Sequence, residues 1–171
     1  DSALSAANEL IETVPTAVLE QPVPPMADWV EGFLGMKYHV FVRFGRWQEL
    51  VDEPFPSNPA LYCTTTALLH YAKGIAHASM CNVEKAEEQQ RLFLAAKALV
   101  PESRTLFNNK TIDILGVAEA MLEGEVEYRK GNYDAAFERL RESGRRETSL
   151  PYDEPWGWMQ PTRHALGALQ L

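Results

Sequence analysis

The stretch 122–141, LEGEVEYRKGNYDAAFERLR, constrains the fold more than any other part of the chain. Gly124 lies within a helical pattern, and Tyr128 follows it by about one turn. The triplet Gly-Asn-Tyr at 131–133 then interrupts the pattern, because glycine and asparagine readily adopt turn conformations. A second helical pattern opens with Ala136. This order predicts two helices joined by a tight turn, that is, a helical hairpin.

Small and aromatic residues at these offsets resemble the tetratricopeptide repeat (TPR), a pair of antiparallel helices of about 34 residues. Parts of the same pattern recur around Gly45 and Cys81. The turns at 45, 81 and 131 lie 36 and 50 residues apart (81 − 45 and 131 − 81), and the first spacing is near the TPR period. The resemblance implies an all-α fold, an α-α superhelix in which TPR-like helical hairpins stack into a solenoid. It also implies binding as the class of function.

The pattern predicts how the chain is organised. We expect residues 1–171 to form a single TPR-like domain, with hairpins at 29–52, 60–100 and 111–143 and half-repeats at 3–14 and 156–171. Both ends fall within a repeat, so the chain is expected to be a fragment of a longer solenoid. The proline-rich stretch 15–28 is predicted to be an extended connector, and 101–110 a loop.

Composition limits the class of partner. The chain carries 16 basic and 24 acidic residues, a formal charge of −8, so nucleic acid and anionic membrane surfaces are disfavoured. No apolar run reaches the roughly 18 residues that a membrane span needs. Cys63 and Cys81 have neither the spacing of a metal site nor the density of a disulfide framework. We therefore predict free thiols and a cytoplasmic location.

Metal and catalytic motifs are missing from the sequence. His70 and His77 stand seven residues apart, or about 10.5 Å along a helix at 1.5 Å per residue, which is too far to share one ion. The chain has no zinc-protease motif, phosphate-binding glycine loop, nucleophile elbow or dinucleotide fingerprint. We expect no metal and no cofactor, and a non-catalytic function is favoured.

The resemblance also implies where a ligand would bind. In TPR proteins the first helix of each hairpin lines a concave surface that holds peptides. When the other hairpins are aligned with the 122–141 hairpin, the candidate peptide-binding residues are His39, Arg43, Tyr71, Glu125, Tyr128 and His164. The lysine and asparagine with which chaperone-binding TPRs clamp a C-terminal carboxylate are replaced here by Tyr71 and Ile75, and by Met121 and Glu125. The expected partner is a protein or peptide, but not the C-terminal tail of a heat-shock chaperone.

A second candidate site is the aromatic and polar segment 152–164. Its rings and charges would line a pocket for a small molecule, the rings stacking on the ligand and the charges orienting it. Under the alternative interpretation, Trp156 and Trp158 attach a long loop to the helices and Asp153 caps the next helix. The residues proposed for the pocket are Tyr152, Asp153, Trp156, Arg163 and His39.

Three hypotheses therefore stand. The leading one is a protein or peptide interaction module that acts as a non-catalytic scaffold. The alternative is a helical-repeat protein with a small-molecule pocket at 152–164, as a binding protein or as part of an enzyme. The third is structural: exposed apolar faces on the end helices would associate to form a homodimer.

Overall fold

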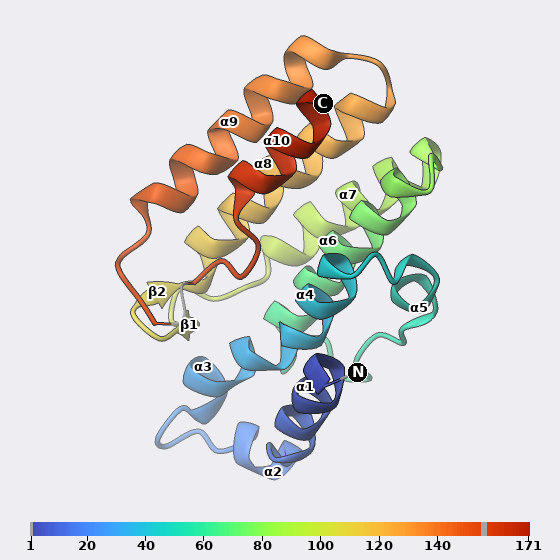
Figure 1. Ribbon diagram of the computed structural model, residues 1–171. Helices are drawn as coiled ribbons and strands as arrows, with labels where there is room; N and C mark the ends of the chain where they lie inside the picture. The colour runs from blue at the N-terminus through green and yellow to red at the C-terminus, as the bar shows by residue number, and fades with distance from the viewer. Residues whose placement is uncertain (1, 155–156) are drawn as a thin grey trace.

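The hairpin that dominates the sequence is present in the computed structural model, which describes residues 2–154 and 157–171. Its helices are α8 (Thr111–Arg129) and α9 (Tyr133–Ser149), which pack against each other as an antiparallel pair (Figure 1). Their close approach depends on Gly124. A Cβ atom there would lie 2.7 Å from Leu140 Cγ and 3.1 Å from the carbonyl oxygen of Ala136. The small residue in the sequence pattern is thus a packing requirement.

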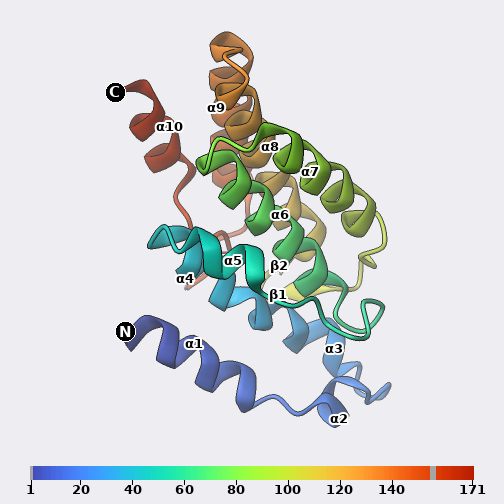
Figure 2. The same cartoon turned by 90° about the vertical axis from the view of Figure 1, so that its right-hand side faces the viewer.

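The remaining elements are mostly helices as well. The N-terminal helices α1 to α3 lie at one end of the molecule, and α9 and α10 lie at the other (Figures 1 and 2). Within the described residues the only strands are β1 (Thr105–Leu106) and β2 (Asn109–Lys110), which pair antiparallel. The helices are α1 (Ser2–Glu12), α2 (Thr16–Leu19), α3 (Met26–Val30), the 3-10 helix η1 (Glu31–Gly35), α4 (Met36–Arg43), α5 (Trp47–Asp52), α6 (Cys63–Ser79), α7 (Val83–Lys97) and α10 (Thr162–Gln170).

The fold is therefore mostly helical, as the all-α prediction requires. Helix α6 packs on α7, and α8 lies against both α6 and α7. Helix α1 contacts α4, whereas α10 contacts α9. The superhelical arrangement and the division into repeats stay predictions. No helix in the described ranges is both long enough and apolar enough to cross a bilayer.

The three predicted turns share one backbone geometry. Gly45, Cys81 and Gly131 have φ angles of 64°, 60° and 83°, in the left-handed region that favours glycine. The amide after each of them donates to the carbonyl five residues earlier, which is the long hydrogen bond of a Schellman motif. The three bonds are Arg46 N to Phe41 O (2.9 Å), Asn82 N to His77 O (2.8 Å) and Asn132 N to Glu127 O (3.0 Å). This recurrence confirms the turns at 45, 81 and 131.

Two segments differ from their predictions. The prediction that residues 15–28 form an extended connector is wrong, because this stretch contains α2 and the start of α3. Leu19 of α2 is buried, and the burial of such a side chain stabilises the short helix although prolines flank it. The predicted loop at 101–110 contains the β1–β2 hairpin.

In the predicted hairpin 29–52, the part before the turn at Gly45 is divided among α3, η1 and α4. The backbone at Gly35 lies so close to α6 that a Cβ atom would be 2.5 Å from Leu68 Cδ1. The tighter winding of η1 also places the carboxylate of Glu31 at the start of α6, where Thr65 N donates to it at 2.7 Å. The break therefore fits this region to the N-terminus of α6.

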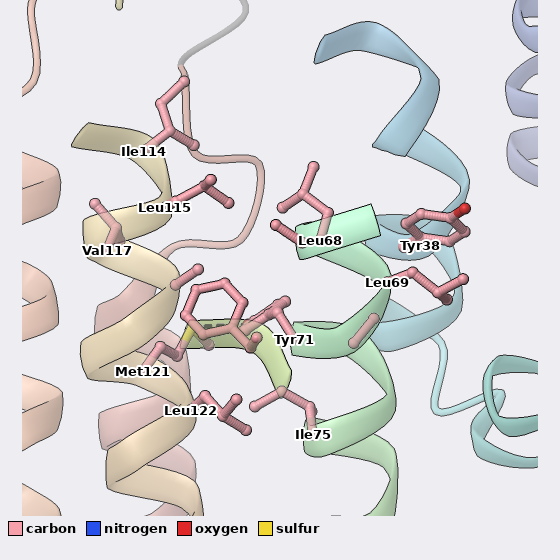
Figure 3. Close-up of a cluster of buried hydrophobic side chains, with 14 of the residues drawn as sticks. Tyr38, Leu68, Leu69, Tyr71, Ile75, Ile114, Leu115, Val117, Met121 and Leu122 are labelled. Atoms are coloured by element: carbon pink, nitrogen blue, oxygen red, sulfur yellow. Dashed lines mark hydrogen bonds between the residues drawn. The ribbon is translucent and has the colours of Figure 1, made fainter. Parts of the chain in front are cut away.

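The centre of the core lies between α6 and α8. Figure 3 shows Tyr71 and Ile75 of α6 facing Met121 and Leu122 of α8, with Leu69 directed to the other side of α6. Close-packed apolar contacts of this kind supply most of the stability of helices that are individually marginal. The largest fully buried side chains include Trp158, Phe93, Leu50, Leu69, Leu115, Leu122 and Leu140.

Candidate functional site

Three of the predicted groove residues lie on neighbouring helices and are buried. His39 of α4 and Glu125 of α8 are each 9% exposed, and Tyr71 of α6 is 2% exposed. The Tyr71 hydroxyl donates to the Met121 sulfur at 3.3 Å, and Figure 3 shows these two side chains directed toward each other between α6 and α8. We call the surface formed by His39, Tyr71 and Met121 the inner face.

The inner face is covered by the chain itself. Trp158, which belongs to no helix or strand, is fully buried against it. The indole ring packs edge-on against His39 and Tyr71, with ring centroids 5.1 and 5.2 Å apart. Gln160 completes the contact: its Oε1 accepts from the Tyr71 hydroxyl at 3.3 Å, and its Nε2 donates to the His39 carbonyl at 3.2 Å. Residues predicted to hold a peptide thus hold residues 158–160.

The two titratable side chains of the inner face, His39 and Tyr71, are uncharged at pH 7. Desolvation lowers the pKa of His39 to about 4, so the imidazole is uncharged. Burial, with a smaller contribution from the negative charge of Glu125, raises the pKa of Tyr71. Burial also raises the pKa of Glu125, against the opposing effect of Arg129, whose guanidinium lies 3.7 Å away. Recognition at this face therefore rests on ring contacts and neutral hydrogen bonds.

An open groove lies beside the inner face, between α1 and α4. It encloses about 360 Å³ and is lined mainly by apolar side chains. Arg43 is exposed at the groove, and no ion pair joins it to another residue in the described ranges. Two candidates from the sequence, His39 and Arg43, are brought together here. The lining residues are Ala3, Ala6, Ala7, Leu10, Met36, His39, Val40, Arg43, Phe44 and Met159.

The segment before Trp158 is attached to the β1–β2 hairpin through Asp153. Its carboxylate accepts from Asn108 N at 3.0 Å and from Asn109 Nδ2 at 3.1 Å, and Asn109 is fully buried. The interpretation of Asp153 as a helix cap is therefore wrong. The carboxylate of Glu147 caps α10 instead, accepting from Thr162 N at 3.1 Å.

A hollow of about 520 Å³ lies next to this attachment. Its lining includes two of the residues proposed for the small-molecule pocket: Asp153, whose carboxylate is already hydrogen-bonded, and Tyr152, which is 77% exposed. Trp156, another residue proposed for this pocket, lies outside the described residues. The other lining residues are Glu147, Leu150, Pro151, Glu154, Gly157 and Trp158.

The remaining candidates lie elsewhere. Tyr128 packs edge-on against Tyr133, at 5.2 Å between ring centroids, beside the turn of the α8–α9 hairpin. Arg163 and His164 are exposed on α10. Arg163 lines a separate hollow between α9 and α10, together with Arg141 and Arg145. The predicted residues are thus divided among the inner face, the α1–α4 groove, the 152–158 loop, the C-terminal end of α8 and the first turn of α10.

Sequence reasoning missed two polar groups that organise this region. Gln160 sits in an irregular segment with no periodic pattern to assign it a face. Arg104 lies in the predicted loop at 101–110, yet it is buried and donates to the carbonyls of Ala27 and Leu61 at 2.8 and 3.1 Å. A hydrophilic loop with a buried arginine leaves no signal in a single sequence, because its partners are distant in the chain.

Comparison of the chain with protein-family models, with curated proteins and with solved structures gave no match. Across the residues described, no group of three or more histidine, cysteine, aspartate or glutamate side chains is placed to hold a metal ion. The geometry itself defines a mostly helical protein, with an open apolar groove at α1 and α4 and an inner face filled by residues 158–160.

Proposed function

We propose that this protein is a TPR-like peptide- or protein-binding module that acts without catalysis, and that the ligand binds in the groove between α1 and α4. The observation that carries the proposal is the combination of an apolar hollow of about 360 Å³ with the exposed guanidinium of Arg43, which forms no ion pair with any residue in 2–154 or 157–171. Grooves of this kind take apolar side chains, while a few polar groups set the orientation.

The chemistry of the groove specifies the ligand. Leu10, Met36, Val40 and Met159 supply apolar surface, which suits one or two apolar side chains of a peptide. Burying each of these side chains contributes about 1.5–3 kcal/mol. Arg43 lies beside that surface and favours a carboxylate next to the apolar residue. The expected ligand is therefore a short segment of a protein in which a leucine, isoleucine or phenylalanine neighbours an aspartate or glutamate.

Selection from a library of random displayed peptides tests the proposal with the whole chain as target. Ala6 is exposed and lines the groove, so Ala6→Trp fills the groove with an indole. Ser5→Trp, on the same helix but outside the lining, is the matched control. Selected peptides should bind Ala6→Trp at least tenfold more weakly than the wild type, since about 1.4 kcal/mol corresponds to tenfold. They should bind Ser5→Trp as tightly as the wild type.

Charge gives an independent check. Arg43→Glu should weaken the same peptides and shift the selected sequences away from acidic residues. Arg141→Glu, a change of equal charge on α9, should do neither. Peptides that bind all four variants and the wild type equally would show that the groove is not the binding site, and the proposal would then be wrong.

A second candidate is the small-molecule pocket at the 152–158 loop, favoured by the hollow of about 520 Å³. A metabolite library screened by thermal shift tests it. A compound whose stabilising effect is lost in Tyr152→Ala, but kept in Tyr133→Ala at another exposed tyrosine, would support this pocket. Two further predictions remain with the proposal: a cytoplasmic location, supported by the free thiols of Cys63 and Cys81, and homodimerisation through the end helices.

A further inference from the structure

The segment on the inner face is held by its side chains. Residues 157–160 form no helix or strand, and within the described chain no backbone–backbone hydrogen bond joins them to other residues. Trp158 supplies the apolar contact and Gln160 supplies two hydrogen bonds, both to atoms of the inner face. An irregular, bent segment that docks through the side chains of Trp158 and Gln160, and not through its backbone, resembles a bound peptide more than a part of the helical framework.

We propose that the inner face is a binding site for a peptide that carries a tryptophan two residues before a glutamine, and that residues 158–160 occupy this site in cis. The indole is the anchor, enclosed by His39 and Tyr71 from two different helices. The carboxamide fixes the register, because it both accepts from Tyr71 and donates to His39 O. A peptide in trans with the same two side chains fits the same contacts.

Because the inner face carries no charge, it should prefer a glutamine to a glutamate in the peptide. Neutral His39 offers a ring edge or face without a charge, and a glutamine satisfies one donor and one acceptor without bringing a charge into a buried place. A glutamate in place of the glutamine would bring a negative charge to the His39 carbonyl, which accepts from the carboxamide in the present structure. The site should therefore reject Trp-x-Glu.

Not every buried polar atom between the cis segment and the inner face forms a hydrogen bond. Trp158 Nε1 and His39 Nδ1 are both buried without a hydrogen-bond partner among the described residues. Each such group opposes the burial of the indole, because a buried donor or acceptor without a partner forfeits its hydrogen bonds to water. The tether to α9 and α10 offsets this loss, because it gives the segment an effective concentration in the millimolar range.

Because the cis segment is part of the chain, it should compete with a free peptide for the inner face, and this competition can be measured. The probe is a fluorescent, capped peptide of residues 157–163 (GWMQPTR), titrated into the full chain. The wild type should bind it weakly, because the cis segment competes. Trp158→Ala vacates the indole position and should bind the probe at least tenfold more tightly than the wild type, by about the advantage that a tether confers. A probe with glutamate in place of its glutamine should lose that gain.

Two controls make the result specific. Trp29 is half exposed on α3, so Trp29→Ala removes a tryptophan from elsewhere and should bind like the wild type. Arg91→Glu, at an exposed arginine on α7, should also leave binding of the GWMQPTR probe unchanged, because it lies outside both the inner face and the α1–α4 groove. Binding to Trp158→Ala that is no tighter than to the wild type would overturn the inference and make Trp158 an ordinary core residue.

Trp158→Ala leaves a large void, so its folding must be followed as well. If that variant loses helical circular dichroism, addition of the probe should restore the signal, and a failure to restore it would overturn the inference. Gln160→Ala removes the hydrogen bonds without emptying the indole position. It should bind the probe more tightly than the wild type and less tightly than Trp158→Ala, and binding equal to the wild type would contradict the role of the glutamine.

Discussion

Glu31 and Arg104 are 73 residues apart in the chain and meet in the interior, where Arg104 Nη1 lies 3.4 Å from Glu31 Oε2. Glu31 is fully buried, and its carboxylate also accepts from Thr64 N at 3.1 Å and from Thr65 N at 2.7 Å. These two amides belong to the first turn of α6, whose positive dipole end favours a carboxylate. One ion pair thus joins η1, the start of α6 and the segment before β1.

Replacement of Glu31 by glutamine should destabilise the protein strongly. The change keeps the shape but leaves the buried guanidinium of Arg104 with one carboxylate, that of Asp28 at 3.2 Å. Breaking a buried pair from one side costs about 3–5 kcal/mol. Urea unfolding measures the loss. Glu49→Gln, at an exposed pair with Arg46, is the control and should change the free energy of unfolding little; equal losses in the two variants would contradict the structural role of Glu31.

Gly124→Ala should disrupt the α8–α9 hairpin. The added methyl group would meet Leu140 at 2.7 Å and the backbone oxygen of Ala136 at 3.1 Å, so the helices must separate. Overpacking of this kind costs about 1–3 kcal/mol, more than alanine gains in helix propensity. Gly167 of α10 has nothing within 4 Å of its added Cβ, so Gly167→Ala should be neutral or slightly stabilising. Thermal unfolding of the two variants measures the difference. If Gly124→Ala does not change the stability, the close approach of α8 and α9 at Gly124 would be refuted.

Asp153→Ala should loosen the loop that carries the cis segment. Asn108 and Asn109 would lose their shared acceptor, and Asn109 has no access to water. Asn109 Nδ2 would keep its bond to Pro151 O at 3.2 Å, but its second N–H would be buried without a partner, which costs about 1–3 kcal/mol. Limited proteolysis between α9 and α10 should be faster than in the wild type, whereas Glu154→Ala, at an exposed neighbour, should leave it unchanged. Equal proteolysis rates would show that Asp153 does not hold the loop.

The parts of the fold that sequence predicted are those set by local chemistry. A left-handed residue is needed to close each Schellman motif, and glycine meets that need at 45 and 131, so the turns are visible in the sequence. Cys81 adopts the same conformation without being glycine, and only the helical patterns on either side of it predict its turn. Gly124 likewise marks a close contact with the residues of its own hairpin.

The candidate site was only partly predictable, because its covering comes from far along the chain. Helical register placed His39, Tyr71 and Glu125 on related faces, and the structure brings the first two together. Nothing in the register says that Trp158 and Gln160 would fill the space between them. Such contacts join residues 89 and 121 positions apart, and an irregular segment has no period from which its buried side can be read.

His39 should make stability depend on pH. Burial lowers its pKa from 6.5 to about 4, so between these values the unfolded chain binds more protons than the folded protein. The contribution of His39 is therefore complete above pH 6.5 and is lost as the pH falls toward 4, at about 1.4 kcal/mol per unit, or about 3 kcal/mol in all. Burial shifts the pKa of His77 in the same direction, whereas the raised pKa of Glu125 acts with the opposite sign.

A comparison of variants isolates this effect. Urea unfolding at pH 7 and pH 4.5 should show a larger loss for the wild type than for His39→Gln, because the variant has no proton to bind at this position. His164→Gln, at an exposed histidine on α10, should lose as much as the wild type. An NMR titration of the His39 ring gives the same answer directly, with a midpoint near 4. A midpoint near 6.5 would mean that water reaches the imidazole and that residues 158–160 do not seal the inner face.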